Sequence, residues 1–260
     1  MKNVFYKYHG AGNDFLMADG RDCGPMDPVF VSKLCDRHLG FGADGLILVR
    51  PSDKASFRME YFNSDGSTGM MCGNGGRCIV AFADRLGYEK YDFEAADGIH
   101  EGEILSREGD VTMVRISMKD VTEVRNFGPD YFMDTGTRHF VKFVKDVADV
   151  DLVSEALPIR HSSLFAPIGT NVNFVSEHDG CFHVRTFEKG VEAETLACGT
   201  GIVATAIAAH MRTGKFDNQI YTYKIKAAVA TLEVSFLATT SGFKNIHLTG
   251  PAEFVGMVEK

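Results

Sequence analysis

The sequence of 260 residues has no long hydrophobic run and no dense block of basic residues. No stretch approaches the roughly 18 apolar residues that a transmembrane helix needs, and residues 1–7 lack the apolar segment of a secretory signal. Lysine and arginine number 27 against 35 for aspartate and glutamate, so the formal net charge is −8. Such a chain is not expected to bind nucleic acid or an anionic membrane. These absences predict a cytoplasmic protein without a membrane or nucleic acid partner.

Cysteine is also sparse, and its spacing argues against several common kinds of site. Six cysteines in a chain of this length do not indicate a disulfide scaffold. Cys72 and Cys78 have five residues between them, which fits neither a CxxC redox pair nor paired zinc ligands. We therefore expect no metal site, and we interpret the other thiols as buried or incidental: Cys23, Cys35, Cys78 and Cys181.

One short pattern, in contrast, occurs twice. Residues 72–75 read Cys-Gly-Asn-Gly, and residues 198–201 read Cys-Gly-Thr-Gly. Apolar residues at helical spacing follow the first loop and end at Gly87. Residues 202–211 follow the second loop and are apolar nearly all round, as in a buried helix. The sequence therefore predicts that Cys72 and Cys198 each lie directly before a helix N-terminus.

That placement favours proton transfer by the two thiols. The partial positive charge and unpaired N–H groups of a helix N-terminus stabilise a thiolate. A contribution of up to about 2 kcal/mol would lower the pKa of a cysteine from about 8.5 to about 7. The flanking glycines would also let a carboxylate approach the loop N–H groups. If one thiol removes a proton from an α-carbon and the other delivers one from the opposite side, a stereocentre is inverted.

The surrounding elements repeat as well. The first half predicts strands over 4–8, 45–49, 57–62, 91–94, 99–105 and 111–118, a turn over 9–15, and a helix from Pro28 that ends at Gly40. The second half predicts strands over 131–134, 138–144, 171–175, 181–187, 220–225, 231–237 and 244–248, and a helix over 151–157 limited by Pro158. The halves overlay with an offset of 126 residues, the separation of Cys72 and Cys198. We expect an α+β fold of two similar domains, 1–119 and 120–250, that face each other across a cleft, with residues 251–260 returning to the first domain.

Four motifs resemble those of the diaminopimelate epimerase family. They are HGAGNDF at 9–15, FNSDGS at 62–67, MCGNGGRC at 71–78 and ETLACGTG at 194–201, and the resemblance covers essentially the whole chain. It implies two pseudo-symmetric domains, each a β-barrel-like sheet around a central helix, with the active site between them. It also implies cofactor-independent interconversion of L,L- and meso-diaminopimelate in lysine and cell-wall synthesis, by a homodimer.

The resemblance also implies roles for particular residues. Cys72 and Cys198 match the acid–base thiols, His139 matches an orienting histidine, and Glu188 matches an acid that helps to bind the reacting end. The positions that match substrate-binding residues are Asn13, Asn63, Gly73, Asn74, Asn171, Glu188, Lys189, Gly199 and Thr200.

The chain departs from the family pattern at four places, one of which is residues 162–170, where the usual arginine before Asn171 is missing. Thr137 and Arg138 precede His139, where the family has Asn-Pro. Lys189 replaces an arginine and cannot form a bidentate fork with a carboxylate. Gly45 stands where some members carry glutamine, so that contact must be absent.

Four other interpretations stay open. Proline racemase and hydroxyproline epimerase also use two thiols, but their first loop typically reads Cys-Gly-His. Cys72 and Cys198 could instead form a redox switch. A cysteine hydrolase using Cys72 and His139 would leave Cys198 unexplained. A non-catalytic binding protein would have no activity for single Cys→Ala substitutions to alter.

Overall fold

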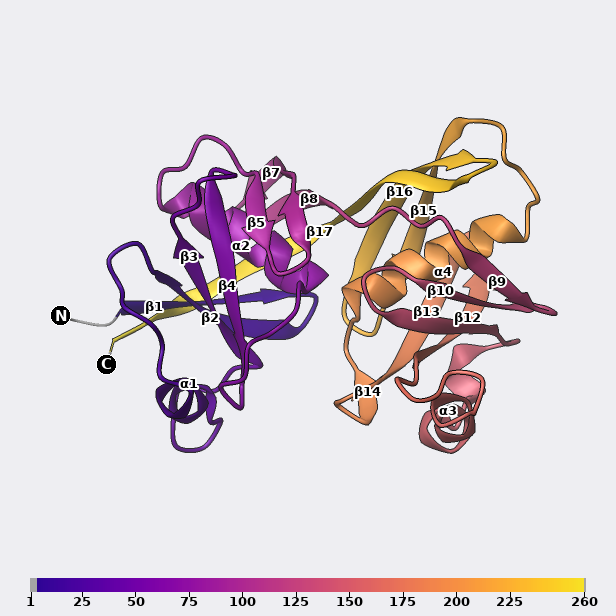
Figure 1. Ribbon diagram of the computed structural model, residues 1–260, viewed down its shortest axis with the longest axis horizontal. Helices are drawn as coiled ribbons and strands as arrows, with labels where there is room; N and C mark the ends of the chain where they lie inside the picture. The colour runs from indigo at the N-terminus through magenta and orange to yellow at the C-terminus, as the bar shows by residue number, and fades with distance from the viewer. Residues whose placement is uncertain (1–3, 260) are drawn as a thin grey trace. The chain divides into compact units, whose positions relative to one another are not determined.

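The structure is a computed structural model, and it describes residues 4–259. The chain forms two compact units (Figure 1). Within the described residues, the first unit comprises 4–116 and 250–259, and the second comprises 117–249. The functional domain boundaries inferred from the sequence stay a prediction.

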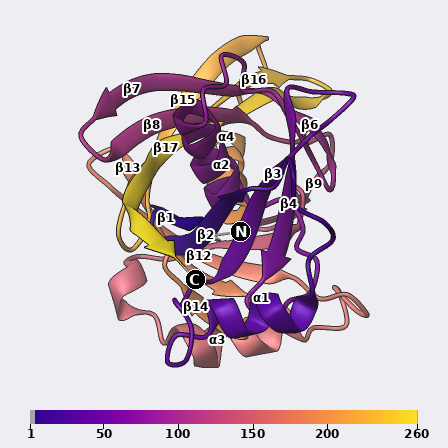
Figure 2. The ribbon, with the colours of Figure 1, turned by 90° about the vertical axis from the view of Figure 1, so that its left-hand side faces the viewer.

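The first unit is a sheet that surrounds one helix. Its strands are β1 (Val4–Gly10), β2 (Asn13–Asp19), β3 (Gly45–Arg50), β4 (Phe57–Asn63), β5 (Phe93–Ala95), β6 (Gly98–His100), β7 (Gly102–Glu108), β8 (Val111–Ser117) and the end of β17 (Gly242–Glu259). Pairing is antiparallel for β1–β2, parallel for β2–β3, antiparallel for β3–β4 and parallel for β4–β5. The end of β17 pairs with both β1 and β8. The central helix α2 (Gly73–Arg85) packs against β1, β2, β3 and β7, as Figure 2 shows.

The second unit repeats this arrangement. Its strands are β9 (Val124–Phe127), β10 (Asp130–Asp134), β11 (Arg138–Phe143), β12 (Asn171–His178), β13 (Cys181–Glu188), β14 (Ala193–Thr195), β15 (Gln219–Lys226), β16 (Thr231–Thr239) and the start of β17. Pairing is antiparallel for β10–β11, parallel for β11–β12, antiparallel for β12–β13 and parallel for β13–β15. The central helix α4 (Gly199–Met211) packs against β10 to β13, β15 and β16. The order of strand directions therefore matches that of the first unit, as the predicted duplication requires.

A short helix covers the outer face of each sheet. In the first unit, α1 (Pro28–Cys35) buries Val31 and Leu34 against the apolar side chains of β2 to β4. In the second, α3 (Leu152–Arg160) buries Leu152 and Ala156 against β11 to β13, after the 3-10 turn η1 (Val147–Asp149). Each sheet thus has an apolar layer on both faces, and the central helix is enclosed on the inner one.

Small residues let the central helices lie close to the strands. In α2, a Cβ at Gly75 would be 2.8 Å from Ile47 Cδ1, and a Cβ at Gly76 would be 3.0 Å from Ile116 Cδ1. A larger residue at either position would require the ends of these side chains to shift. Residues 73–83 of α2 and 199–210 of α4 are buried without interruption. This confirms the helix predicted after each cysteine loop and the burial predicted for the second helix.

Several predicted boundaries are wrong. The helix expected to reach Gly40 ends at Cys35, because the Asp36 carboxylate accepts hydrogen bonds from the backbone N–H groups of His38 and Leu39 and turns the chain. The helix expected to stop before Pro158 continues to Arg160, so Pro158 lies inside it.

Some strands also differ from those expected. The turn predicted over 9–15 is narrower, because β1 runs to Gly10 and β2 starts at Asn13. The strand expected over 99–105 is two strands, β6 and β7, separated at Glu101. The short strands β9 and β14 were not predicted. The α+β class and the paired architecture are nevertheless confirmed. Within residues 4–259, no helix is both long and apolar enough to cross a membrane.

Candidate functional site

The first cysteine loop lies at the start of α2. Cys72 is the N-cap residue, with φ −119° and ψ 122°, so its backbone is extended while its carbonyl already accepts from the N–H of Gly76 at 2.7 Å. Its side chain makes no capping hydrogen bond, and the residue is half-buried. The thiol therefore stands at the positive end of the helix dipole, as predicted.

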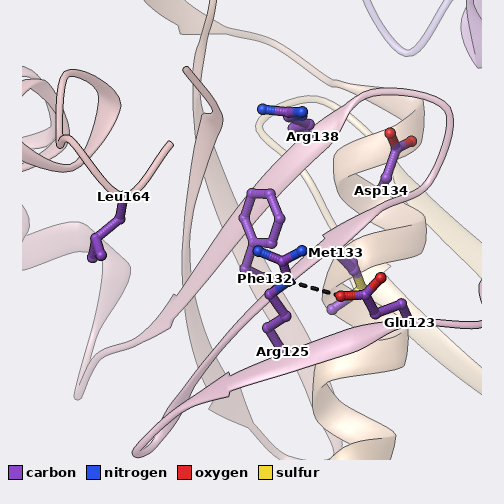
Figure 3. Close-up of a pocket in the computed structure, with 7 residues that line it drawn as sticks. All are labelled: Glu123, Arg125, Phe132, Met133, Asp134, Arg138 and Leu164. Atoms are coloured by element: carbon purple, nitrogen blue, oxygen red, sulfur yellow. Dashed lines mark hydrogen bonds and ion pairs between the residues drawn. The ribbon is translucent and has the colours of Figure 1, made fainter. Parts of the chain in front are cut away.

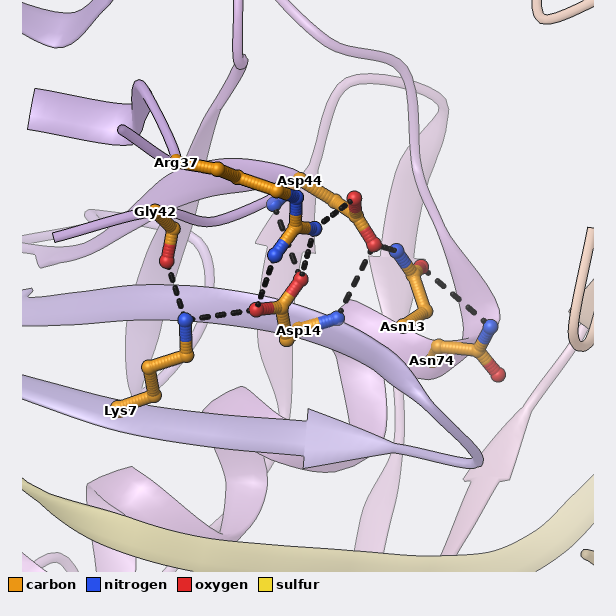
Figure 4. Close-up of polar contacts among 7 residues, drawn as sticks. All are labelled: Lys7, Asn13, Asp14, Arg37, Gly42, Asp44 and Asn74. Carbon is orange, nitrogen blue, oxygen red and sulfur yellow. Dashed lines mark hydrogen bonds and ion pairs between the residues drawn. The ribbon is translucent and has the colours of Figure 1, made fainter. Parts of the chain in front are cut away.

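A chain of two amides connects this loop to the β2–β3 edge. Asn74 Nδ2 donates to Asn13 Oδ1 at 3.4 Å, and Asn13 Nδ2 donates to Asp44 Oδ2 at 2.6 Å (Figure 4). Cys72 Sγ lies 3.5 Å from the same Asn13 Oδ1. The structure thus brings together three predicted site residues: Asn13, Cys72 and Asn74.

Asn13 lies next to a cluster of two carboxylates, Asp14 and Asp44, and two cations, Lys7 and Arg37, whose charges balance. Arg37 bridges Asp14 and Asp44, with 2.7 Å from Nη2 to an oxygen of each, and Lys7 Nζ contacts Asp14 at 2.7 Å (Figure 4). Burial alone would raise the pKa of Asp14, but hydrogen bonds from Arg37 and Lys7 outweigh it and hold the pKa at about 2. The cluster fixes the Asp44 carboxylate that orients Asn13.

The other end of the amide chain is a buried arginine. Arg77 has no exposed surface; its guanidinium donates to Asn74 Oδ1 at 2.9 Å, to Gly73 O at 3.0 Å and to Pro251 O at 3.3 Å. Among residues 4–259, no carboxylate forms an ion pair with it. Burial lowers the pKa of Arg77. Arg77 was not among the predicted site residues, although an arginine in a buried helix is itself a signal.

Asn63 lies at the end of β4, opposite Gly45 of β3. Its Nδ2 donates to Ser67 Oγ at 3.0 Å, so the structure does not join it to the chain of Asn13 and Asn74. A Cβ at Gly45 would be only 2.3 Å from Phe62 O and 2.5 Å from Tyr61 Cε2. The absence of the glutamine that some family members carry here is therefore enforced by the backbone of β4.

The second cysteine loop has the same geometry. Cys198 is the N-cap of α4, with φ −107° and ψ 110°, and its carbonyl accepts from Ile202 N at 2.9 Å. It is more buried than Cys72. Its Sγ lies 3.5 Å from Thr200 Oγ1. Thr200 is therefore the hydroxyl nearest to this thiol in the loop.

His139 is wholly buried beside this loop. Its Nδ1 is 3.0 Å from Asn173 Nδ2, and its Nε2 is 2.8 Å from Thr200 Oγ1 and 2.9 Å from Thr137 Oγ1. Burial lowers the pKa of His139 to about 3, so the imidazole is neutral at physiological pH. His139 thus contacts the second loop through Thr200 and is poorly suited to act as a proton donor.

Asn171 also joins this network. Its Nδ2 donates to Arg138 O at 3.0 Å and to Thr137 Oγ1 at 3.2 Å, and its Oδ1 accepts from Lys189 N at 2.8 Å. Asn171 is 4% exposed, and these bonds link β11 to the residue that follows β13. The Lys189 side chain is exposed. Glu188 accepts from Thr195 Oγ1 at 2.9 Å across the β13–β14 pair.

Arg138 points away from this network. It lines a pocket of about 240 Å³ with Arg125, Phe132 and Asp134 (Figure 3). Since side chains alternate along a strand, His139 faces α4 while Arg138 faces the opposite side of β11. None of the predicted site residues lines this pocket.

The remaining cysteines differ from those at the two N-caps. Cys35 and Cys78 are buried, and burial raises their pKa values to about 11 and about 12. Cys23 is exposed and Cys181 is half-buried. Within residues 4–259, no group of three or more His, Cys, Asp or Glu side chains is arranged to hold a metal ion.

Comparisons with known proteins agree with these motifs. The family model of diaminopimelate epimerase matches residues 5–122 and 131–255. A diaminopimelate epimerase of Flavobacterium psychrophilum is 45% identical over 255 residues, covering 96% of this chain and 97% of its own. The diaminopimelate epimerase of Chlorobaculum tepidum is 40% identical over 257 residues, covering 95% of this chain and 96% of its own.

Solved structures share the fold at much lower identity. A phenazine biosynthesis protein of the PhzF family from Bacillus anthracis has a TM-score of 0.76 and 15% identity, covering 100% of this chain and 99% of its own. A hydroxyproline epimerase from Agrobacterium vitis has a TM-score of 0.64 and 16% identity, covering 100% of this chain and 91% of its own. At such identities these structures support the α+β architecture alone.

Proposed function

The chain belongs to the diaminopimelate epimerase family, and we propose that it interconverts L,L- and meso-diaminopimelate with Cys72 and Cys198 as the two proton-transferring groups. The proposal is supported by one observation: in each of the two similar units, a cysteine is the N-cap of the buried central helix. A single structural thiol would not require that symmetry.

The proposed reaction conserves atoms and charge. A thiolate takes the proton from the α-carbon of the substrate, and the electron pair of that C–H bond remains on a carbanion next to the carboxylate. The thiol of the other cysteine gives its proton to the opposite face and becomes the new thiolate. The backbone N–H groups at the starts of α2 and α4 suit the carboxylate, because the helix dipole favours negative charge there. The protein needs no cofactor for these steps.

The other predicted residues have supporting roles in the proposal. Asn13, Asn63 and Asn74 would recognise the polar groups of the amino acid together with Gly73, Gly199 and Thr200. Glu188 and Lys189 would act near the reacting end, and Asn171 would keep its β11–β13 bonds while contacting substrate. His139 would orient Thr200 and not transfer protons itself, because its imidazole stays neutral.

Further properties are proposed on family membership alone. The small amino acid diaminopimelate is the expected substrate, with a role in lysine and peptidoglycan synthesis in the cytoplasm. A homodimer is the expected assembly. Sedimentation of the purified protein would test it.

Proton NMR in deuterated water tests the reaction directly. Reduced protein is mixed with L,L-diaminopimelate in one tube and with proline in another. We expect loss of the α-proton signal and growth of the meso isomer in the first tube only. The variants Cys72→Ala and Cys198→Ala should each abolish isomer formation, while Cys23→Ser and Cys181→Ser should retain it. Exchange of proline alone would contradict the proposed substrate, and exchange of neither would contradict the proposed reaction.

A further inference from the structure

Two glycines leave room for the ring of Tyr61 in the first unit. The three heavy atoms nearest to a Cβ at Gly69 would all belong to this ring, and the farthest of them, Cγ, would be 2.8 Å away. A Cβ at Gly45 would lie 2.5 Å from Cε2 and 3.3 Å from the hydroxyl of the same ring. Neither glycine has a positive φ, so Gly69 provides space and not a left-handed turn. The ring therefore lies between these two positions, with its hydroxyl at Gly45.

The strand pairing places this ring beside two strands that carry predicted site residues. Gly45 of β3 is the Cα partner of Phe15 in β2 and of Asn63 in β4. Tyr61 precedes Asn63 by two residues, so both side chains leave β4 on the same face. The ring of Tyr61 contacts that of Phe15 edge to face, with the centroids 5.8 Å apart. The hydroxyl thus lies over the row that Phe15, Gly45 and Asn63 form across the sheet.

The same face of β2 leads to the first thiol. Asn13 lies two residues before Phe15 and shares its face of the strand, and Asn13 Oδ1 is 3.5 Å from Cys72 Sγ. This is the inner face of the sheet, because a Cβ at Gly75 in the first turn of α2 would be 3.6 Å from Phe15 Cζ. Tyr61 is half-buried on this face. An aromatic ring with a phenol hydroxyl therefore shares the inner face with the amide that contacts Cys72.

The chemistry of tyrosine suits one part of an elongated amino acid. The ring offers an apolar surface to methylene groups. A phenol hydroxyl can donate one hydrogen bond and accept others, so it can bind an ammonium or carboxylate group in addition to the contacts that it already makes. The N–H groups at the start of α2 suit the reacting carboxylate. Tyr61 extends from the sheet and not from that helix, so its hydroxyl is assigned to the other end of the substrate.

We propose that Tyr61 is a specificity-determining residue of the epimerase, whose ring packs on the methylene chain of diaminopimelate and whose hydroxyl binds the amino-acid end that does not react. The inference rests on the proposed function, which supplies the substrate. It adds a residue that lies outside the four motifs and that the resemblance does not assign. Amino acids without a second polar end gain nothing from this hydroxyl.

Fluorine NMR of protein labelled with 3-fluorotyrosine tests the contact without turnover. The chain has eight tyrosines, and the resonance missing from Tyr61→Phe identifies position 61. We expect L,L-diaminopimelate to move this resonance and norleucine, which has one polar end, to leave it in place. Tyr6 is the internal control, because its ring packs on Phe82 near the other end of α2, with the centroids 5.0 Å apart. A Tyr61 resonance that diaminopimelate does not move, or that both compounds move equally, would overturn the inference.

Kinetic constants test the role of the hydroxyl. Tyr61→Phe keeps the ring and removes the hydroxyl, so KM for diaminopimelate should rise by about tenfold while kcat changes little. Tyr6→Phe is the matched control and should leave both constants unchanged. Gly69→Ala keeps the hydroxyl but displaces the ring, and it should also raise KM. A Tyr61→Phe protein with KM within twofold of the original value would overturn the inference.

The contact and the proposed reaction have separate readouts. The fluorine resonance reports binding at Tyr61, and α-proton exchange reports the reaction. Movement of the Tyr61 resonance without exchange would contradict only the proposed reaction. Exchange with an unmoved Tyr61 resonance would contradict only the inference.

Discussion

Asn173 Nδ2 donates a hydrogen bond of 3.0 Å to His139 Nδ1, and this contact holds the buried imidazole in one neutral tautomer. Both residues have no exposed surface. The amide is itself fixed by bonds to Phe140 O and from Thr186 Oγ1. His139 can therefore donate only through Nε2, toward the threonines of the second cysteine loop.

The pH dependence of stability should report on this histidine. Its pKa is about 3 in the folded protein against 6.5 as the ordinary value, so below about pH 6.5 the unfolded chain binds a proton that the folded protein does not. The stabilisation is complete above about pH 6.5 and is lost progressively as the pH falls toward about 3. At pH 5 the loss for this group is on the order of 2 kcal/mol.

Urea unfolding at pH 7.5 and pH 5 measures that loss. The drop in unfolding free energy between the two pH values should be smaller in His139→Asn than in the unmodified protein by about 2 kcal/mol. His38→Asn, at an exposed position, should keep the original pH dependence. Equal drops in all three proteins would contradict a buried neutral His139.

Glutamine at position 45 should not be tolerated. A Cβ there would be 2.3 Å from the carbonyl oxygen of Phe62, and backbone cannot move aside as a flexible side chain can. We expect Gly45→Gln to lower the unfolding free energy by about 2 kcal/mol or more, measured by urea titration. Gly24→Gln serves as the control, because no heavy atom lies within 4 Å of a Cβ at Gly24.

Removing the carboxylate of Asp44 should impair the first loop. Without it Asn13 loses the bond of 2.6 Å that sets the direction of its amide. We expect Asp44→Ala to lower kcat/KM for diaminopimelate by about tenfold, as the loss of one charge-assisted hydrogen bond would. Asp19→Ala removes an exposed pair with Arg21 and should leave kcat/KM near its original value. If kcat/KM differs by less than twofold between the two variants, Asp44 does not orient Asn13 for the reaction.

The buried cysteines outside the N-caps should resist modification. The pKa values of Cys35 and Cys78 are raised to about 11 and about 12 by burial. At pH 8 the native protein should therefore show no alkylation at these two positions, while the denatured protein should be labelled at both. Peptide mass spectrometry provides the measurement. Rapid labelling of Cys78 in the native protein would contradict its enclosed position in α2.

The sequence predicted the structural features that depend on a local pattern of residues. The helix starts at Cys72 and Cys198 follow from glycine-rich loops and apolar spacing, and both are confirmed. The strands β9 and β14 were not predicted, because segments of three or four residues contain too little periodicity to stand out. The helix α1 ends at Cys35 because of the side chain of Asp36, whereas the sequence prediction placed its end at Gly40.

The polar networks were the least predictable part. Asp44 contacts Asn13 across 31 residues of sequence, and Asn173 contacts His139 across 34. Arg77 contacts Pro251, which follows it by 174 residues, and no local pattern indicates such a pair. Charge directions and proton positions emerge only when these partners are known. The proposed roles of the individual site residues stay predictions until the variants are measured.

The path of β17 has a consequence for how the protein is made. This strand starts in the second unit, and its last residues form the partner of both β1 and β8 in the first. Because residues 4–10 are synthesised before residues 250–259, the sheet of the first unit is completed only after the whole second unit has been made. During synthesis the second unit has all its strands before the first does, even though its chain begins later. A stop codon at position 250 would leave the first unit with two exposed strand edges, and its product would be a target for aggregation and proteolysis.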